Sequence, residues 1–162
     1  MGDQTNLTSL AAVAAAVPGG FNIVIDDGGH TQQQQLTSMT GLWPHVRPGG
    51  LYIVEDVETS YYPEYGGGDV DATGTFLASV KSMVDVLNLP FSRRSFPQPG
   101  PRLRFPDAEQ LASVKCYRNL CAFQKKYGNE HLASGECVLH VAPVALCVSR
   151  LSCDLFLFGA YS

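Results

Sequence analysis

The chain has 162 residues, of which 45% are hydrophobic and only 16% are charged, and its formal net charge is −4. This length is sufficient for one hydrophobic core, and the low charge excludes a disordered chain or a coiled coil. The negative charge argues against nucleic acid or an anionic membrane surface as the main partner.

The cysteines and the first apolar stretch bear on the compartment. All 5 cysteines lie in the last third of the chain, and no two of them form a Cys-x-x-Cys pair. This pattern does not predict a disulfide framework, so we expect reduced thiols and a cytoplasmic protein. The apolar residues 7–17 follow Asp3 and lack a basic flank, which is not the pattern of a signal peptide. No apolar run reaches the roughly 20 residues that a membrane-spanning helix needs.

The first third of the chain predicts a helix followed by a β-α-β unit. Alanine-rich sequence favours helix, and short β-branched runs favour strands buried on both faces of a parallel sheet. In chain order we expect a helix over 5–17, a strand over 21–25, a helix over 31–43, a return loop containing Pro48, Gly49 and Gly50, and a second strand over 51–54.

The next part begins with a long aromatic and glycine-rich loop over residues 59–74, whose length suggests a lid or a binding loop. A helix over 76–87 should bury Phe76, Val80, Val84 and Leu87 on one face. After a proline-containing loop over 88–106, we expect strands over 112–117 and 120–124, joined by a turn at Arg118 and Asn119.

Acidic residues follow both predicted parallel strands. Asp26 and Asp27 end the first strand, and Glu55 and Asp56 end the second. The carboxyl ends of parallel strands share one edge of a sheet, where ligands bind. Clustered carboxylates repel each other unless hydrogen bonds or a cation neutralise them, and oxygen ligands suit Mg²⁺ or another hard divalent cation. His30 lies close enough in sequence to act as a base beside such an ion.

A purely structural interpretation stays open for the same residues. Asp27 or Thr31 could simply cap the following helix, because acids and hydroxyls at strand ends often do so. A lone histidine at a helix start, such as His30, is more often a surface residue than a catalyst.

Four segments together resemble the class I S-adenosylmethionine-dependent methyltransferases, and in particular the metal-dependent macrolide sugar O-methyltransferases. The segments are GDQTNLTSL (2–10), FNIVIDDGGH (21–30), LWPHVRPGGLYIVEDVETSYYPEYGGG (42–68) and SVKCYRNLCAFQKK (113–126). The resemblance implies an α/β fold, namely part of a Rossmann-like methyltransferase sheet closed by an antiparallel hairpin. It also implies S-adenosyl-L-methionine as methyl donor, Mg²⁺ as the ion and a small-molecule hydroxyl, for example on a sugar, as acceptor.

The resemblance assigns roles residue by residue. Asp27, Glu55 and Asp56 match the positions that hold the metal, and His30 matches the general base. Asp3 and Gln4 match the region near the adenine of the cofactor, and Asp26 matches the region near its methionine end. A final group, in the acceptor-side loop, consists of the aromatic residues Tyr61, Tyr62 and Tyr65.

The resemblance also bears on domain organisation. It covers residues 1–126 as the C-terminal portion of a methyltransferase domain, and residues 127–162 form an extension of unknown nature. The first strand and glycine-rich turn of such a domain do not precede Met1, so we expect weak or no binding of S-adenosylmethionine by this chain alone. The strand over 21–25 should then have an unpaired edge, which favours a homo-oligomer.

Two other functions remain open at this point. The chain could be an inactive methyltransferase-like remnant that serves as an interaction module. It could also be a magnesium-dependent hydrolase, although neither a phosphate-binding glycine loop nor a nucleophile is evident beside the acids.

Overall fold

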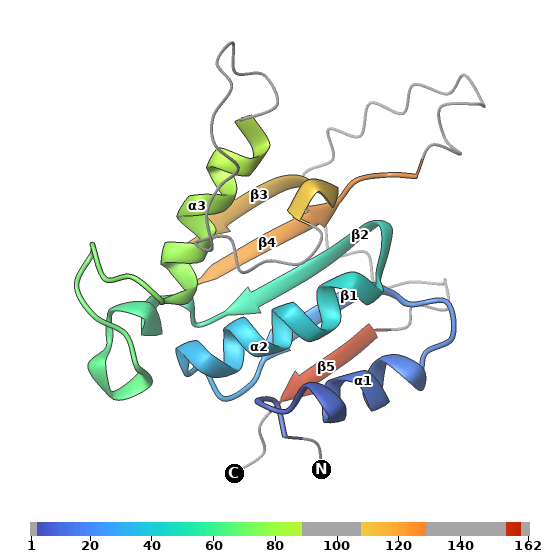
Figure 1. The fold of residues 1–162 in the computed structure, drawn as a ribbon, viewed down its shortest axis with the longest axis horizontal. Coiled ribbons are helices and arrows are strands. Elements are labelled where there is room, and N and C mark those ends of the chain that lie inside the picture. The colour runs from blue at the N-terminus through green and yellow to red at the C-terminus, as the bar shows by residue number, and fades with distance from the viewer. Residues whose placement is uncertain (1–2, 89–107, 129–154, 160–162) are drawn as a thin grey trace.

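The computed structural model describes residues 3–88, 108–128 and 155–159 (Figure 1). Short 3₁₀ helices also occur, at Trp43–His45, Val57–Tyr61, Pro63–Tyr65 and Ala108–Gln110. The helices are α1 (Leu7–Ala15), α2 (Gln32–Leu42) and α3 (Phe76–Asn88), and the strands are β1 (Phe21–Asp27), β2 (Val46–Glu55), β3 (Leu111–Tyr117), β4 (Leu120–Lys125) and β5 (Leu155–Gly159).

The strands form one mixed sheet in the order β3-β4-β2-β1-β5. β1 pairs in parallel with β2, and the hairpin of β3 and β4 joins the other edge of β2 antiparallel. The parallel pair and the closing hairpin are therefore those expected from the sequence. The turn between β3 and β4 is at Arg118 and Asn119, as predicted, and Asn119 has a φ of 61°.

β5 pairs in parallel with β1 along the edge that the sequence suggested would be unpaired. Leu157 lies opposite Ile25, and Gly159 lies opposite Asp27. The expectation of an unpaired edge is therefore wrong, because a segment from the last part of the chain supplies the neighbouring strand. Nothing in the local pattern of residues 155–159 specifies which strand edge they join.

β2 is longer than predicted, because Pro48, Gly49 and Gly50 belong to the strand and not to a return loop. The register between β1 and β2 shifts between Phe21 and Ile23, which accommodates these residues. Gly49 has a φ of 77°, and its N–H donates to the carbonyl of Lys126 at 3.1 Å. Pairing with β1 and with the segment after β4 thus overrides the preference of Pro48, Gly49 and Gly50 for a turn.

Only one face of the parallel strands is fully buried. Val24, Tyr52 and Val54 face the helices and are inaccessible to solvent, whereas Ile23 and Ile53 on the other face are half-buried. The prediction that these strands are buried on both faces is wrong to that extent. In Figure 1 the three helices lie on one side of the sheet, with α2 between α1 and α3.

Helix α3 packs through Phe76, whose ring meets Phe123 of β4 edge to face at 6.0 Å between centroids. Val80 and Met83 complete its buried side. Val84, expected in the core, is 51% exposed, whereas its neighbour Met83 is 0% exposed. The other expected residues, Phe76, Val80 and Leu87, pack against the core, so the prediction is wrong at Val84 alone, whose place Met83 takes.

Helix caps explain where α1 and α2 begin. The Asn6 side chain accepts a hydrogen bond from the N–H of Thr8 at 2.8 Å. Thr31 caps α2 in a reciprocal capping box with Gln34. Since Thr31 performs this role, Asp27 is not needed as the cap of α2.

None of the helices in the described ranges is long and apolar enough to cross a bilayer.

Candidate metal and base site

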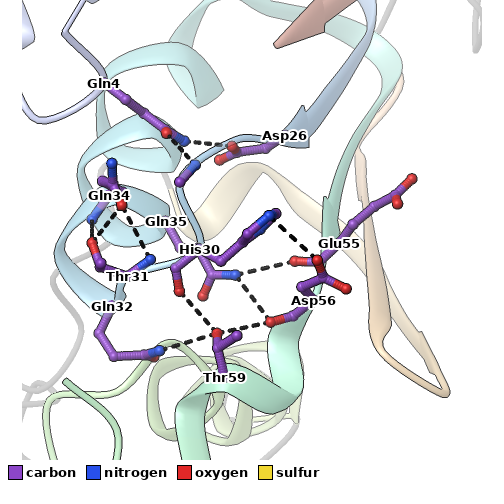
Figure 2. Close-up of polar contacts among 11 residues, drawn as sticks. Gln4, Asp26, His30, Thr31, Gln32, Gln34, Gln35, Glu55, Asp56 and Thr59 are labelled. Carbon is purple, nitrogen blue, oxygen red and sulfur yellow. Dashed lines mark hydrogen bonds and ion pairs between the residues drawn. The ribbon is translucent and has the colours of Figure 1, made fainter. Parts of the chain in front are cut away.

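The ends of β1 and β2 bring three side chains together. Asp27, His30 and Asp56 each offer a ligand atom, and these atoms all lie within 4.8 Å of one another. Nε2 of His30 is 3.3 Å from Oδ2 of Asp56 (Figure 2). This group is the convergence expected from acids at the carboxyl ends of adjacent parallel strands.

His30 and Asp56 also share an uncommon backbone conformation. Their φ angles are 56° and 50°, in the left-handed region that residues with a side chain seldom adopt. Among the described residues, Asn119 of the hairpin turn is the other non-glycine residue with a positive φ. Two of these three positions therefore belong to the candidate site, and such strain persists only where surrounding contacts impose it.

Hydrogen bonds from buried residues hold these two positions. The Thr59 hydroxyl lies 2.9 Å from the carbonyl oxygen of His30 and 2.8 Å from that of Asp56. Nε2 of Gln35 donates to the carbonyls of Glu55 at 3.1 Å and Asp56 at 3.4 Å. Figure 2 shows Thr59 and Gln35 on the side of the backbone opposite the ion pair.

Gln32 connects this network to the start of α3. Its Nε2 donates to Thr59 Oγ1 at 3.3 Å, and its Oε1 accepts from Ser60 Oγ at 2.9 Å and from the N–H of Phe76 at 2.8 Å. Sequence reasoning missed Thr59, Gln32 and Gln35. Thr59 lies in segment 42–68, one of the four that carry the resemblance, which was a signal for it. Nothing in a run of four glutamines indicates which two are buried.

Glu55, expected as a third metal-holding carboxylate, lies outside the group within the part of the chain that the structure describes. Its side chain points away from His30 in Figure 2. Burial raises the pKa of Glu55, the negative charges of Asp27 and Asp56 raise it further, and His30 opposes the shift. Glu55 therefore interacts electrostatically with the residues of the site, although it lies outside the group.

Of the residues expected to contact the cofactor, Gln4 and Asp26 are brought together. Nε2 of Gln4 donates to Oδ1 of Asp26 at 2.6 Å, and Tyr52 Oη donates to Oδ2 of the same carboxylate at 2.9 Å. Asp26 is only 3% exposed, and this burial raises its pKa to about 7, although the hydrogen bonds from Tyr52 and Gln4 oppose the shift. Both carboxylate oxygens of Asp26 are thus engaged inside the protein.

Asp3 lies apart from that pair. It is exposed, and its carboxylate accepts hydrogen bonds from the N–H and the hydroxyl of Thr5, which lower its pKa. Its visible role is local, at the start of the segment that leads into α1.

The tyrosines of the expected acceptor loop follow β2: Tyr61 ends one short 3₁₀ helix, Tyr65 ends the next, and Tyr62 lies between the two. Tyr61 and Tyr62 are exposed, and Tyr65 is half-buried. The rings of Tyr62 and Tyr65 are 6.4 Å apart between centroids. The expected open loop is therefore partly folded, and it leaves aromatic faces accessible to solvent.

The hairpin that closes the sheet carries a disulfide between Cys116 and Cys121. The expectation of reduced thiols is wrong for this pair, because antiparallel pairing places the two residues directly opposite each other. The other cysteines lie outside the described residues. The hairpin turn also contacts the site segment, since the N–H of Val57 donates to the carbonyl of Asn119 at 3.2 Å.

Comparison with known proteins gives consistent results. No family model matches the chain. The chain is 38% identical over 134 residues to demethylmacrocin O-methyltransferase of Streptomyces fradiae, covering 80% of this chain and 32% of that protein. It is 44% identical over 88 residues to mycinamicin VI 2''-O-methyltransferase of Micromonospora griseorubida. This match covers 53% of this chain and 22% of that protein.

A solved structure matches the fold as well as the sequence. MycE methyltransferase from the mycinamycin biosynthetic pathway, in complex with Mg and SAH, superposes with a TM-score of 0.68 at 35% identity. The match covers 78% of this chain and 32% of that one. The chain thus spans about a third of the length of the relatives it matches most extensively. Within that span, the chain has the fold of part of a class I methyltransferase domain, and its sequence is similar to those of macrolide sugar O-methyltransferases.

Proposed function

We propose that this chain is part of an S-adenosylmethionine-dependent O-methyltransferase that uses a divalent cation to methylate a hydroxyl of a sugar or another small molecule. The observation that carries the proposal is the convergence of Asp27, His30 and Asp56 at the shared edge of β1 and β2. The relatives support the substrate class, since their names specify O-methylation of demethylmacrocin, of mycinamicin VI and of a rhamnosyl tetracenomycin.

The donor set fits a hard divalent cation. The two carboxylates of Asp27 and Asp56 would be the ligands, and their oxygen atoms lie within 4.8 Å of each other and of a ring nitrogen of His30, which stays free to act as a base. Carboxylates at this separation repel each other, and a cation between them removes that repulsion. Oxygen-rich sites favour Mg²⁺ or Mn²⁺ over zinc, and the related MycE structure was solved with Mg. A cation bound there lowers the pKa of an alcohol beside it.

His30 is proposed as the general base. Imidazole exchanges protons near neutral pH, and Nε2 of His30 would take the proton of the acceptor hydroxyl. Oδ2 of Asp56, 3.3 Å from that nitrogen, would stabilise the imidazolium that results. Asp27 and Asp56 would hold the cation, and Glu55 would add negative charge beside them.

The methyl donor is assigned from the relatives, because the MycE structure contains SAH. Gln4 and Asp26 line the carboxyl edge of β1, and Gln4 Oε1 accepts from the N–H of Gly29 at 2.9 Å. We infer that these residues act on the cofactor by fixing the loop after β1. The assignment of Asp3 rests on resemblance alone. Gly28 faces the side chain of Gln4, so this turn is not an open phosphate-type cradle.

The acceptor would lie against Tyr61, Tyr62 and Tyr65. Exposed aromatic faces suit the apolar faces of sugar rings and other ring substrates. Tyr62 and Tyr65 present such faces next to each other, since their ring centroids are 6.4 Å apart.

Metal binding can be tested on the chain as it exists. The probe is Mn²⁺, titrated into the wild-type chain and followed by electron paramagnetic resonance. Asp27→Asn and Asp56→Asn should each weaken Mn²⁺ binding by about 10-fold or more, because each removes a charged ligand. Asp69→Asn is the matched control, since Asp69 is an exposed acid outside the group. Equal affinity in all four proteins would overturn the metal site.

Transfer itself is tested by incubating the chain with S-adenosylmethionine, Mg²⁺ and a macrolide that carries a free sugar hydroxyl. Formation of S-adenosylhomocysteine and of a product heavier by one methylene, both measured by mass spectrometry, would support the enzyme. His30→Asn should abolish the product while leaving Mn²⁺ binding measurable. Product formation that persists in this variant would contradict the role of His30 as base. Hydrolysis of p-nitrophenyl phosphate, with no methylation, would instead support the alternative function of a magnesium-dependent hydrolase.

The alternative of an inactive interaction module has a different signature. Under that function, variants at Asp27 and Glu55 would leave the biological role intact, and the wild-type chain would transfer no methyl group. Methyl transfer by the wild-type chain in the presence of S-adenosylmethionine, Mg²⁺ and the macrolide would exclude an inactive module.

A further inference from the structure

We propose that Thr59 is a positioning residue, whose hydroxyl fixes the backbone of His30 relative to that of Asp56 and thereby sets the geometry of the metal and base site. The inference rests on the proposed function for its consequence, but its structural content can be tested without it. Thr59 lies two residues before Tyr61, and the function proposed above gives a role to Tyr61 but none to Thr59.

The Thr59 hydroxyl contacts a residue distant in sequence as well as a near neighbour, which an ordinary local hydrogen bond does not do. A threonine hydroxyl often bonds the carbonyl three residues earlier, as Thr59 does with Asp56 at 2.8 Å. The same hydroxyl lies 2.9 Å from the carbonyl oxygen of His30, which is 29 residues away in sequence. One side chain therefore joins the segments that follow two different strands.

The two joined residues are those with left-handed backbone. His30 has a φ of 56° and Asp56 a φ of 50°, conformations that cost free energy in residues with a side chain. The carbonyls that Thr59 contacts belong to these same two peptide units. The hydroxyl has one proton, which the two carbonyl oxygens share, and this shared hydrogen bond favours the observed arrangement over the ordinary right-handed or extended alternatives.

The surroundings hold Thr59 in place. Its side chain is buried, at 5% exposure for the residue, and Nε2 of Gln32 donates to its oxygen at 3.3 Å. Gln32 is itself fixed by Ser60 and by the first turn of α3. Gln35 holds the segment before Thr59 through hydrogen bonds from its Nε2 to the carbonyls of Glu55 and Asp56. Thr59 is thus the contact through which this buried network reaches His30.

The test compares three substitutions. Thr59→Val keeps the shape and removes the hydroxyl, whereas Thr59→Ser keeps the hydroxyl and removes the methyl group. Thr75→Val is the matched control, because Thr75 is also a threonine at 5% exposure and its hydroxyl accepts only a local bond from the N–H of Ala78. Urea unfolding of each variant shows how much stability each hydroxyl contributes.

Two readouts separate positioning from stability. The first is the three-bond coupling between amide and Hα protons of His30 and Asp56, measured by NMR in the metal-free chain. Thr59→Val should move at least one of these couplings away from its left-handed value, and Thr59→Ser and Thr75→Val should retain both. The second is Mn²⁺ affinity, which Thr59→Val should lower by about 10-fold and Thr59→Ser should largely restore.

The outcomes remain distinguishable. If Thr59→Val retains both couplings, Thr59 does not position the site and the inference is overturned. If the couplings change as expected but the wild-type chain does not bind Mn²⁺, the proposed function fails and the positioning role stands. If Thr75→Val alters couplings and affinity as much as Thr59→Val does, the effect is one of general stability, which also overturns the inference.

Discussion

Nε2 of His30 lies 3.3 Å from Oδ2 of Asp56, although each residue follows a different strand and each has a left-handed backbone. Parallel pairing of β1 with β2 brings their segments to one edge of the sheet. A buried set of polar side chains then fixes the final orientation. The site thus depends on packing behind it as much as on the acids themselves.

The buried carboxyl of Asp26 should make stability depend on pH. Burial raises its pKa from the ordinary value of 3.8 to about 7. Between these two values the folded state keeps a proton that the unfolded state has lost, so the contribution of Asp26 is most favourable at low pH and is lost as pH rises toward 7. The slope is up to about 1.4 kcal/mol per pH unit.

Asp26→Asn should remove this slope, because the amide does not titrate. The check is urea unfolding of both proteins from pH 4 to pH 8, with the difference between them plotted against pH. A difference that does not vary with pH would contradict the raised pKa. Tyr52→Phe should steepen the loss near neutral pH, since Tyr52 donates to the ionised carboxylate at 2.9 Å.

The disulfide of the closing hairpin should stabilise the fold. The two cysteines are separated by 5 positions, so the closed loop is short. Chain-entropy arguments give about 2 kcal/mol for a loop of this size. Urea unfolding with and without dithiothreitol should show that difference, and Cys116→Ser should lose stability only under oxidising conditions. Identical unfolding midpoints with and without reductant would contradict it.

Strand β5 should protect the edge of β1. Deleting residues 155–162 removes the backbone partner of Ile23, Ile25 and Asp27. We expect lower stability and concentration-dependent aggregation, because an unpaired strand edge can pair with another chain. Deleting residues 160–162 alone is the control. Sedimentation at several concentrations measures the association, and a monomeric, equally stable deletion variant would show that β5 contributes nothing.

The phase of helix α3 can be checked with two neighbouring residues. Met83 is fully buried and Val84 is 51% exposed. Met83→Ala should cost about 2–5 kcal/mol of unfolding free energy through lost contacts and a cavity. Val84→Ala should change stability by less than about 0.5 kcal/mol. The reverse order of effects would mean that the helix presents the face expected from sequence.

Several features of the fold could be predicted from local sequence. The β-branched run beginning at Phe21, the helix caps and the two-residue turn at Asn119 all express preferences of a few consecutive residues. The acids at strand ends indicated the site for a related reason, because parallel strands must end at a common edge. The phase of α3 near Val84 failed because small differences in packing decide which of two adjacent apolar residues turns inward.

The residues behind the site could not be predicted in this way. Gln32 and Gln35 are buried, at 4% and 1% exposure, although glutamine is mostly a surface residue. Thr59 and Ser60 pair with the amide group of Gln32, and backbone carbonyls accept from Nε2 of Gln35, which offsets most of the cost of burying these groups. Among the described residues, Oε1 of Gln35 is buried without a hydrogen-bond partner. The partners of these amide groups lie 20 or more residues away, and no local pattern specifies them.

The sequence by itself determined the α/β alternation, the closing hairpin and the acidic character of the edge where β1 and β2 end. It did so because propensity, capping and strand-end chemistry depend on near neighbours. Only the tertiary structure decided that β5 pairs with β1, that Cys116 meets Cys121, and that Thr59 joins His30 to Asp56. These contacts link distant segments, and their free energy exists only once the sheet has brought the segments together.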